Sequence, residues 1–300
     1  MKNVLAFIRL GRPLFLGGGF ILFGLGAVIA AFHGHAIDVR RYVLGQGAVT
    51  AFQLMTHYAN DYFDFAADQA NLTPTRWSGG SRVLVAGELP RKVALIAAVV
   101  LAAIGIAISA VLVADAGLSI VPTLVGMAAL AWMYSAPPVR LCARGLGEVT
   151  TAIVVTGLVP WLAFTLQAPD LRGASDLLLA IAPLAVLQVA MLVAIEFPDA
   201  DGDGATGKRT LVVRLGAERS AKLYVMLLTL AYLCLPIAAL FDLPTRVVIA
   251  ATLPTPLAAW RVAGIADAAD PKAHERLTFF AVFLLIGTSL AELVAFATFL

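Results

Sequence analysis

The feature that most constrains this chain is a series of nine apolar stretches, each long enough to cross a lipid bilayer as a helix. A transmembrane helix needs roughly 17–25 predominantly apolar residues. Such stretches fall at 14–33, 43–60, 92–114, 116–136, 147–167, 177–197, 221–241, 243–263 and 277–299. Of the 300 residues, 61% are hydrophobic and 13% are charged, whereas soluble domains have about 45–50% and about 25%. The sequence therefore predicts an all-α polytopic membrane protein with nine transmembrane helices.

The N-terminal thirty residues also have some features of a secretory signal peptide. Lys2, Arg9 and Arg12 precede an apolar run that ends in small residues, which is the order of a basic region and a hydrophobic region in such peptides. Because eight further apolar stretches follow, we interpret the segment as a retained first transmembrane helix.

The basic residues are distributed very unevenly between the two predicted sides of the membrane. With nine spans, 17 of the 21 lysines and arginines lie on the side of the N-terminus, and four lie on the other side, namely Arg40, Arg41, Arg172 and Arg246. Positively charged loops are retained in the cytoplasm. The sequence therefore predicts an integral protein of the cell inner or plasma membrane, with a cytoplasmic N-terminus and an external C-terminus.

Two segments share one spacing of polar residues, Q-x7-[DE]-x2-D-x3-D, at an offset of 135 positions. The first comprises Gln53, Asp61, Asp64 and Asp68, and the second comprises Gln188, Glu196, Asp199 and Asp203. Both occur where a predicted span reaches the cytoplasmic side. This repetition predicts a single domain, 1–300, built from two four-helix units at about 1–138 and 139–263, with an extra helix at 277–299.

The acidic residues of both segments indicate a metal site. Seven of the 19 acidic residues lie there, His57 belongs to the same polar stripe as Gln53, Asp61, Asp64 and Asp68, and Asn60 offers an amide oxygen beside them. Carboxylates could merely cap helices at the headgroups, but clustered like charges are unfavourable unless a cation neutralises them. Oxygen ligands of this kind suit magnesium, which takes one or two carboxylates together with substrate phosphates and water.

The string DADGDG within the second segment resembles the start of a calcium-binding EF-hand loop. Asp199, Asp201 and Asp203 would be its first ligands, with Gly204 at the turn. The twelfth position should be a bidentate glutamate, but here it is Thr210. The EF-hand interpretation is therefore rejected.

Basic and glycine-rich stretches follow each acidic cluster. The first loop contains Arg76 and the sequence GGSR, which ends at Arg82, and the second contains GKRT with Lys208 and Arg209. Arginine, lysine and exposed backbone amides bind phosphate oxygens. Positive-inside topology alone would account for any single one of these cations, but acidic clusters and basic loops on the same face together favour a metal–diphosphate site.

Several motifs resemble the UbiA superfamily of intramembrane prenyltransferases. NDYFDFAAD at 60–68 matches the first acidic motif of that family, and the DxxxD of Asp199–Asp203 matches the second. GKRTLVVRLG, YSAPPVRL and RGLGE are similar to the branch that prenylates 1,4-dihydroxy-2-naphthoate in menaquinone biosynthesis. The resemblance covers the chain from Arg12 to about Gly216.

The resemblance implies a bundle of nine helices around a central cavity and a Mg²⁺-dependent transfer of an isoprenyl group from its diphosphate to an aromatic acceptor. Catalytic roles are implied for Tyr134, Asp64 and Asp199. The implied metal ligands are Asn60, Asp61, Asp64, Asp68, Asp199 and Asp203, and the implied diphosphate ligands are Arg82, Lys208, Arg209, Arg140 and Arg12. The expected partners are the isoprenyl diphosphate, the aromatic acceptor and the lipid bilayer, with no nucleic acid.

Acceptor-binding roles are expected for His57, Gln53 and Glu196. Leu192 stands where the hydroxybenzoate branch has a further aspartate, which argues against that branch. Glu196 stands where relatives of the naphthoate branch usually have asparagine, so an extra carboxylate there could alter acceptor choice.

Two other functions remain open from the residues alone. Intramembrane acids also mark ion and proton pathways, but transporters place them near the midplane, whereas these acids lie at one membrane face. A membrane terpene cyclase would share the metal site and quench the carbocation with the donor's own double bonds.

Overall fold

The computed structural model describes residues 2–264 and 270–300, and within these ranges all regular secondary structure is helical. Residues 265–269, in the predicted loop before the last span, lie outside the described residues. The helices are α1 (Lys2–Leu10), α2 (Pro13–Phe32), α3 (Val39–Phe63), α4 (Phe65–Ala70), α5 (Arg91–Ala116), η1 (Leu118–Ile120), α6 (Val121–Met133), η2 (Leu141–Arg144), α7 (Gly147–Thr151), η3 (Ala152–Leu158), α8 (Val159–Gln167), α9 (Ala174–Glu196), α10 (Ala200–Ala205), α11 (Leu211–Leu215), α12 (Ala217–Leu240), α13 (Thr245–Ala251), α14 (Thr255–Ala263), η5 (Pro271–Ala273) and α15 (His274–Ala297).

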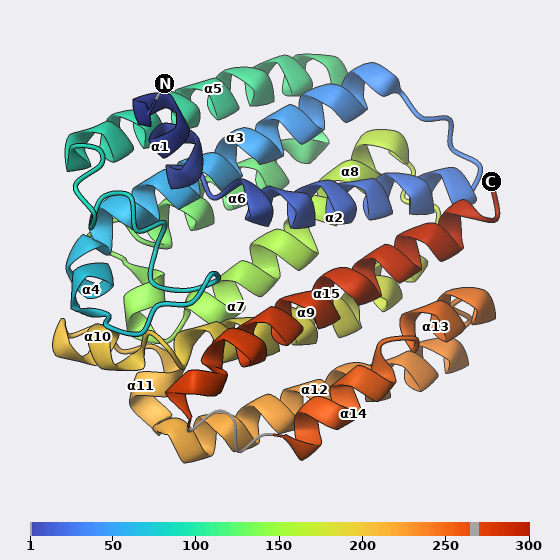
Figure 1. Cartoon of the computed structure of the whole chain (residues 1–300). Coiled ribbons are helices and arrows are strands. Elements are labelled where there is room, and N and C mark those ends of the chain that lie inside the picture. The colour runs from blue at the N-terminus through green and yellow to red at the C-terminus, as the bar shows by residue number, and fades with distance from the viewer. Residues whose placement is uncertain (1, 265–269) are drawn as a thin grey trace.

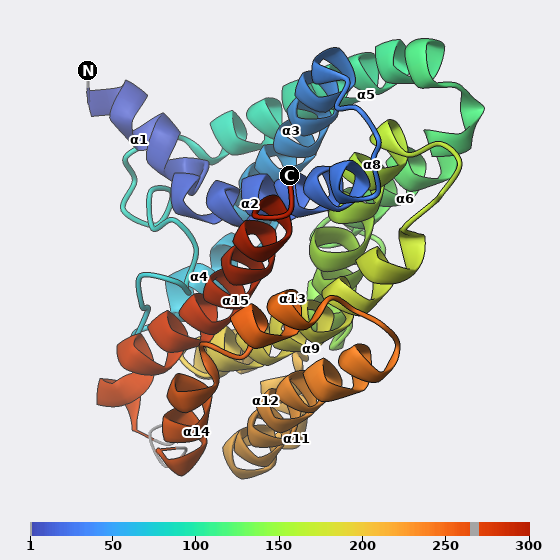
Figure 2. The same ribbon diagram turned by 90° about the vertical axis from the view of Figure 1, so that its right-hand side faces the viewer.

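The long helices run side by side, so that the bundle has two distinct ends (Figure 1). The short helices α4, α10 and α11 lie together at one end, and the C-terminus lies at the other. Seen from the C-terminal end, α5 and the α12–α14 segment lie toward the outside of the bundle, while α2, α9 and α15 are more central (Figure 2).

Six helical segments of the described chain are long and apolar enough to cross a membrane. They are Pro13–Phe32, Arg91–Ala116, Gly147–Gln167, Ala174–Glu196, Ala217–Leu240 and Pro271–Ala297. The predicted second span corresponds to α3, which is long enough but more polar, and the fourth corresponds to the shorter apolar segment Leu118–Met133. The structure thus confirms an all-helical membrane protein, while the count of nine spans stays a prediction.

The predicted span 243–263 is wrong as one continuous helix. It is divided into α13 and α14 at residues 252–254. Pro254 lacks the amide proton that a continuing helix requires, and Pro256 lies at the start of α14, where proline is tolerated. Two prolines this close therefore end one helix and begin another.

The segment Gly147–Gln167 is also irregular, because η3 is a stretch of π-helix between α7 and α8. Pro160, which follows it, cannot donate an amide hydrogen bond to the carbonyl group four residues earlier. A wider turn is a common response to such an interruption, and π-turns occur often beside functional sites.

Close contact between α2 and α8 depends on a glycine. A Cβ atom at Gly26 would lie 2.8 Å from the carbonyl carbon of Pro160 and closer still to its oxygen. Gly17, on the same helix, has no neighbouring atom within 4 Å of the corresponding position. The small residue at 26 therefore allows the two backbones to approach, as is usual in membrane helix pairs.

Gly26→Ala is expected to destabilise the protein by about 1–3 kcal/mol, because the added methyl group forces α2 away from α8. Thermal unfolding in detergent micelles would measure this change. Gly17→Ala is the matched control, since it adds the same methyl group in open space. Equal unfolding temperatures for the two variants would contradict the proposed packing constraint.

Candidate active site

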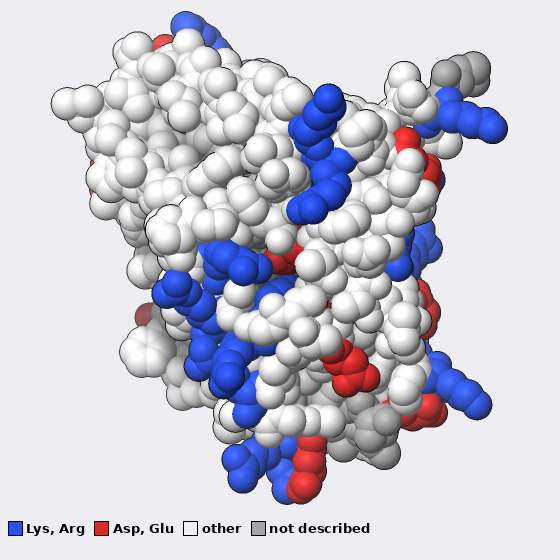
Figure 3. All heavy atoms as spheres, turned by 90° about the vertical axis from the view of Figure 1, so that its left-hand side faces the viewer, with Lys and Arg blue, Asp and Glu red and all other residues white. Residues whose placement is uncertain are grey.

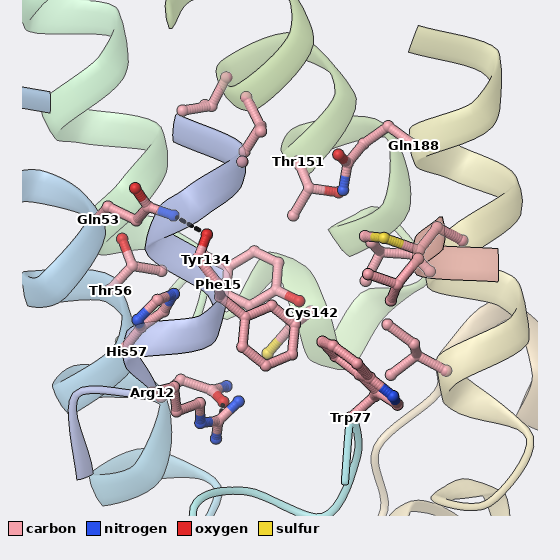
Figure 4. A pocket seen from close by; sticks show the side chains of 18 of the residues that line it. Arg12, Phe15, Gln53, Thr56, His57, Trp77, Tyr134, Cys142, Thr151 and Gln188 are labelled. Carbon is pink, nitrogen blue, oxygen red and sulfur yellow. Dashed lines mark hydrogen bonds between the residues drawn. The ribbon is translucent and has the colours of Figure 1, made fainter. Parts of the chain in front are cut away.

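A cavity of about 500 Å³ lies inside the bundle and contains most of the predicted site residues. Its walls come from α2, α3, α6, the α7–η3 segment, α9 and α15, and most of its lining is apolar. Figure 4 shows Gln53 and His57 on one side, Thr151 and Gln188 on another, and Arg12 at the polar end. The volume is within the range of about 300–1,000 Å³ found for small-molecule sites.

The two acidic motifs meet at the polar end of this cavity. α3 ends at Phe63, so a bend at Asp64 and the short helix α4 interrupt the continuous polar stripe expected from the sequence. α10 packs against α4, and a Cβ atom at Gly202 would lie 2.9 Å from the Ala67 carbonyl oxygen. Gly202, the first glycine of DADGDG, thus permits close approach of the two motifs.

Lys208 connects the motifs directly. Its Nζ atom lies 3.0 Å from a carboxylate oxygen of Asp64 and 3.0 Å from one of Asp203. Burial alone would lower the pKa of Lys208, but the two carboxylates raise it well above its usual range. The ammonium group therefore stays charged and holds the two acidic groups together.

Asn71 provides a second link, by donating a hydrogen bond of 2.6 Å from its side-chain amide to Asp199. Asp199 also accepts hydrogen bonds from the Ser78 hydroxyl group and the Gly79 backbone amide. The loop that follows the first motif is thus fastened to the second motif.

Arg12 and Ser81 hold the side chain of Asp61. The guanidinium group of Arg12 forms an ion pair with Asp61 and a hydrogen bond of 3.1 Å with Asn60, while the hydroxyl and backbone amide of Ser81 also donate to Asp61. Asp61 is 3% exposed and is not among the described residues that line the cavity. Its position fits fixation of Arg12 better than direct contact with a ligand.

Gly80 and Arg82 surround Asp68. A Cβ atom at Gly80, where φ is +71°, would collide with the Asp68 carboxylate, and Arg82 donates to the backbone carbonyl of Asp68. The GGSR loop, which the sequence suggests as a phosphate cradle, therefore packs against the acidic residues.

Burial changes the protonation of the acidic residues outside the membrane-spanning helices. It raises the pKa of Asp68 to about 8 and that of Asp199 to about 7, and it also raises the pKa of Asp203. Burial disfavours the charged form of a carboxyl group, and here it outweighs the opposing effect of Lys208 and Arg12. Protons would therefore compete with a cation for these oxygens near neutral pH.

The side-chain oxygens at this end of the cavity are suited to bind magnesium together with a substrate phosphate. Asn60, Asp64, Asp68, Asp199 and Asp203 line the cavity, and one oxygen of Asp64 accepts no hydrogen bond from the described residues, with Arg140 Nη2 3.8 Å away. No group of three His, Cys, Asp or Glu side chains in the described part of the chain is arranged to hold a metal ion by itself. Magnesium that shares its ligands between one or two carboxylates and a substrate phosphate needs no such group.

The predicted acceptor residues have different environments. His57 Nδ1 lies 2.8 Å from the carbonyl oxygen of Gly11, and Gln53 donates a hydrogen bond of 2.8 Å to the carbonyl oxygen of Phe15. Both residues line the cavity, as does Tyr134.

Glu196 also lines the cavity, but its carboxyl group is directed to α11. It is hydrogen-bonded to Glu148 and accepts a hydrogen bond of 3.4 Å from the Val212 amide. Glu148 in turn accepts one of 3.0 Å from the Leu211 amide. The pair therefore fixes the first turn of α11, close after Lys208.

Arg140 and Arg209 are not among the described residues that line the cavity. Arg209 is exposed, and the Arg140 side chain is 39% exposed beside Asp64. Figure 3 shows the end of the bundle that carries the motif loops, where basic side chains surround a hollow with acidic groups inside it. Because both arginines are partly or fully exposed and lie outside the described lining, we assign them to the rim of the hollow and not to its interior.

Sequence reasoning missed several residues of the site. Asn71, Ser78, Trp77, Cys142 and Glu148 all contact or line it. Glu148 is part of the quoted RGLGE motif and could have been found from it. The other four have no distinctive spacing, because only the folded chain brings them to the acidic residues.

Comparison with known proteins identifies the family. The UbiA prenyltransferase family matches residues 19–284. The chain is 24% identical over 228 residues to 1,4-dihydroxy-2-naphthoate octaprenyltransferase of Bacillus subtilis (strain 168), covering 75% of this chain and 70% of that protein. It is 30% identical over 238 residues to digeranylgeranylglyceryl phosphate synthase of Thermococcus kodakarensis, covering 78% of each.

Solved structures agree in fold. A structure of digeranylgeranylglyceryl phosphate synthase superposes with a TM-score of 0.67 at 17% identity and covers 99% of this chain and 100% of that chain. A UbiA homologue from Archaeoglobus fulgidus bound to GPP and Mg²⁺ gives a TM-score of 0.59 at 15% identity, covering 97% and 99%. The chain is therefore a membrane enzyme that transfers isoprenyl groups and belongs to the UbiA prenyltransferase family.

Proposed function

We propose that this enzyme uses Mg²⁺ to transfer an isoprenyl group from an isoprenyl diphosphate to an aromatic acceptor, a quinone precursor such as 1,4-dihydroxy-2-naphthoate. The observation that carries the proposal is the division of one cavity into a highly charged end and a long apolar part. A diphosphate suits the charged end, and an isoprenyl chain suits the apolar walls. The naphthoate acceptor is supported by the Bacillus relative.

Backbone geometry supports a diphosphate site at the charged end. Among the described residues, five other than glycine have positive φ angles, and three of them are Arg12, Arg82 and Arg140, at +49°, +64° and +46°. Such conformations are unfavourable for residues with a Cβ atom and tend to persist at functional sites. All three arginines are predicted diphosphate ligands.

Asn60, Asp64, Asp68, Asp199 and Asp203 would hold the metal, which supplies Lewis-acid stabilisation of the charge that develops on the diphosphate. Lys208 and Arg12 neutralise the remaining negative charge at the same end of the cavity. The allylic C–O bond breaks with its electron pair leaving on the diphosphate. Apolar walls exclude water, so that the carbocation is captured by the acceptor and not hydrolysed.

His57 is suited to accept the proton that the aromatic carbon loses when the new C–C bond forms. A backbone carbonyl can only accept a hydrogen bond, so His57 Nδ1 carries a proton toward Gly11. In the neutral imidazole, Nε2 then has a free lone pair. Tyr134, also in the lining, can present its aromatic face to the positively charged carbon.

A glyceryl phosphate lipid that already carries one geranylgeranyl group is a second candidate acceptor, because the Thermococcus relative has the higher identity. Such an acceptor brings a second phosphate group into the site. The basic residues of the described lining are Arg12 and Lys208, and both are paired with acidic residues. The remaining polar lining around Gln53 and Gln188 is uncharged, which favours an aromatic acceptor.

The terpene cyclase and the transporter are less well supported. A cyclase would leave the polar groups deep in the cavity without a partner. A transporter would need a polar path across the bundle, whereas most of the cavity wall beyond the acidic end is apolar.

Asp64→Ala and Asp199→Ala are each expected to reduce turnover by at least about 100-fold, because each removes a charge that positions the cation and diphosphate. Asp201→Asn is the matched control, since Asp201 lies in the same motif but is exposed. Diphosphate release by purified protein in lipid would measure turnover. Full activity of correctly folded Asp64→Ala would exclude the metal-site assignment.

The acceptor class can be tested with geranylgeranyl diphosphate, Mg²⁺ and protein in lipid, with either 1,4-dihydroxy-2-naphthoate or geranylgeranylglyceryl phosphate added. We expect diphosphate release that depends on the naphthoate and a prenylated ring detected by mass. Product from geranylgeranylglyceryl phosphate but not from the naphthoate would favour the second candidate. Hydrocarbon formed without acceptor would indicate a cyclase.

The predicted orientation can be tested with single cysteines in a variant that lacks Cys142 and Cys234. Leu72, 90% exposed, lies in the loop between the first motif and α5, whereas Leu118, 78% exposed, lies between α5 and α6. A membrane-impermeant maleimide should label Leu118→Cys in intact cells and Leu72→Cys only after permeabilisation. The reverse pattern would invert the proposed topology.

A further inference from the structure

Gln188 has a buried side-chain amide in the cavity wall that takes no part in holding the described helices together. It lies on α9, is 3% exposed and lines the cavity. Within residues 2–264 and 270–300, no hydrogen bond from or to its side-chain amide is found. A buried amide usually has hydrogen-bond partners, and an unused one in a cavity wall is available to a ligand.

Gln53 provides the natural comparison, because it has the same place in the other copy of the repeated spacing. Its Nε2 atom donates to the carbonyl oxygen of Phe15, and its Oε1 atom lies 2.4 Å from the place that a Cβ atom at Gly19 would take. Gln53 thus joins α3 to α2, and its amide is largely committed to this contact. Gln188 has the same chemistry without such a commitment.

Thr151 lies beside Gln188 at the cavity wall (Figure 4). Its hydroxyl group donates a hydrogen bond of 2.9 Å to the Glu148 carbonyl oxygen, so its oxygen can still accept one. Thr151 directly precedes the π-helical segment η3, which lines the same side through Val154 and Val155. Together, the amide and the hydroxyl form a small polar patch in an otherwise apolar wall.

The position of the patch distinguishes between the possible ligand groups. Gln188 lies eight residues before Glu196 on α9, which is about 12 Å along a helix and therefore well inside the cavity from the acidic end. An isoprenyl chain against this wall would leave the amide without a partner, which is unfavourable. A hydroxyl group can both donate to Oε1 and accept from Nε2, and so it satisfies both ends of the amide.

We propose that Gln188, with Thr151 beside it, binds a ring hydroxyl group of the aromatic acceptor at the part of the ring system that lies away from the diphosphate. This inference rests on the proposed function, because it names the residues that recognise the acceptor. Gln188 is then a specificity-determining residue, and His57 and Gln188 contact the acceptor from different walls.

Gln188→Leu tests the proposal by removing both hydrogen-bonding groups from a side chain of similar size. With geranylgeranyl diphosphate as donor, the KM for 1,4-dihydroxy-2-naphthoate should rise about tenfold while the KM for the donor stays unchanged. Leu187→Met, on the same helix but not among the described residues that line the cavity, is the matched control and should leave both KM values near those of the wild type. Thermal unfolding in detergent checks that each variant is folded.

The preference between two acceptors that differ by one hydroxyl group is a measurement that a general structural defect would not change. The wild type should prefer 1,4-dihydroxy-2-naphthoate to 1-hydroxy-2-naphthoate by about tenfold in kcat/KM, and Gln188→Leu should lose this preference. Gln188→Asn keeps the amide on a shorter side chain and should retain part of the preference for 1,4-dihydroxy-2-naphthoate. This variant keeps the test available if the leucine variant does not fold.

An unchanged preference in a folded Gln188 variant would overturn the inference while leaving the proposed function intact. A rise in the KM for the donor with no change for the acceptor would also overturn it, because the wall would then contact the isoprenyl chain. Failure of the wild type to prenylate either naphthoate would refute the proposed acceptor class, and the inference with it.

Discussion

The charge balance at one end of the bundle is the constraint on which the site depends. Asp64 and Asp203 come from different halves of the chain, and the Lys208 ammonium group lies 3.0 Å from both. Without an opposite charge, these buried carboxylates would repel one another. Lys208 therefore holds the two motifs together and keeps their oxygens available as a negatively charged surface for a divalent cation.

Small residues and unusual backbone conformations allow this concentration of charge. Gly202 lets α10 approach α4, and Gly80 leaves room for the Asp68 carboxylate. Arg12 and Arg82 adopt positive φ angles while their side chains turn to the first motif. Packing elsewhere must offset the cost of these conformations, and the extensive apolar core between α2, α3, α8 and α9 provides such packing.

Much of the site could be predicted from the sequence because its residues recur at a regular spacing. The pairing of the two acidic motifs and their placement at the same end of the bundle follow from that pattern, and Lys208 is predicted from the basic loop that follows the second motif. The direction of individual side chains did not follow, since it depends on contacts between distant segments. Asp61 is held by Arg12 and Ser81, and Glu196 is held at α11 by contacts that include Glu148.

The sequence by itself determined that this protein is a helical membrane protein with two related acidic motifs, because hydrophobic length and polar spacing are local properties of the chain. Tertiary structure decided where helices break and which polar groups remain free. Prolines divide the predicted eighth span, and the α2–α3 contact engages Gln53 while Gln188 stays available in the cavity wall. Two glutamines with the same spacing thus differ because hydrogen bonding depends on the neighbouring helix.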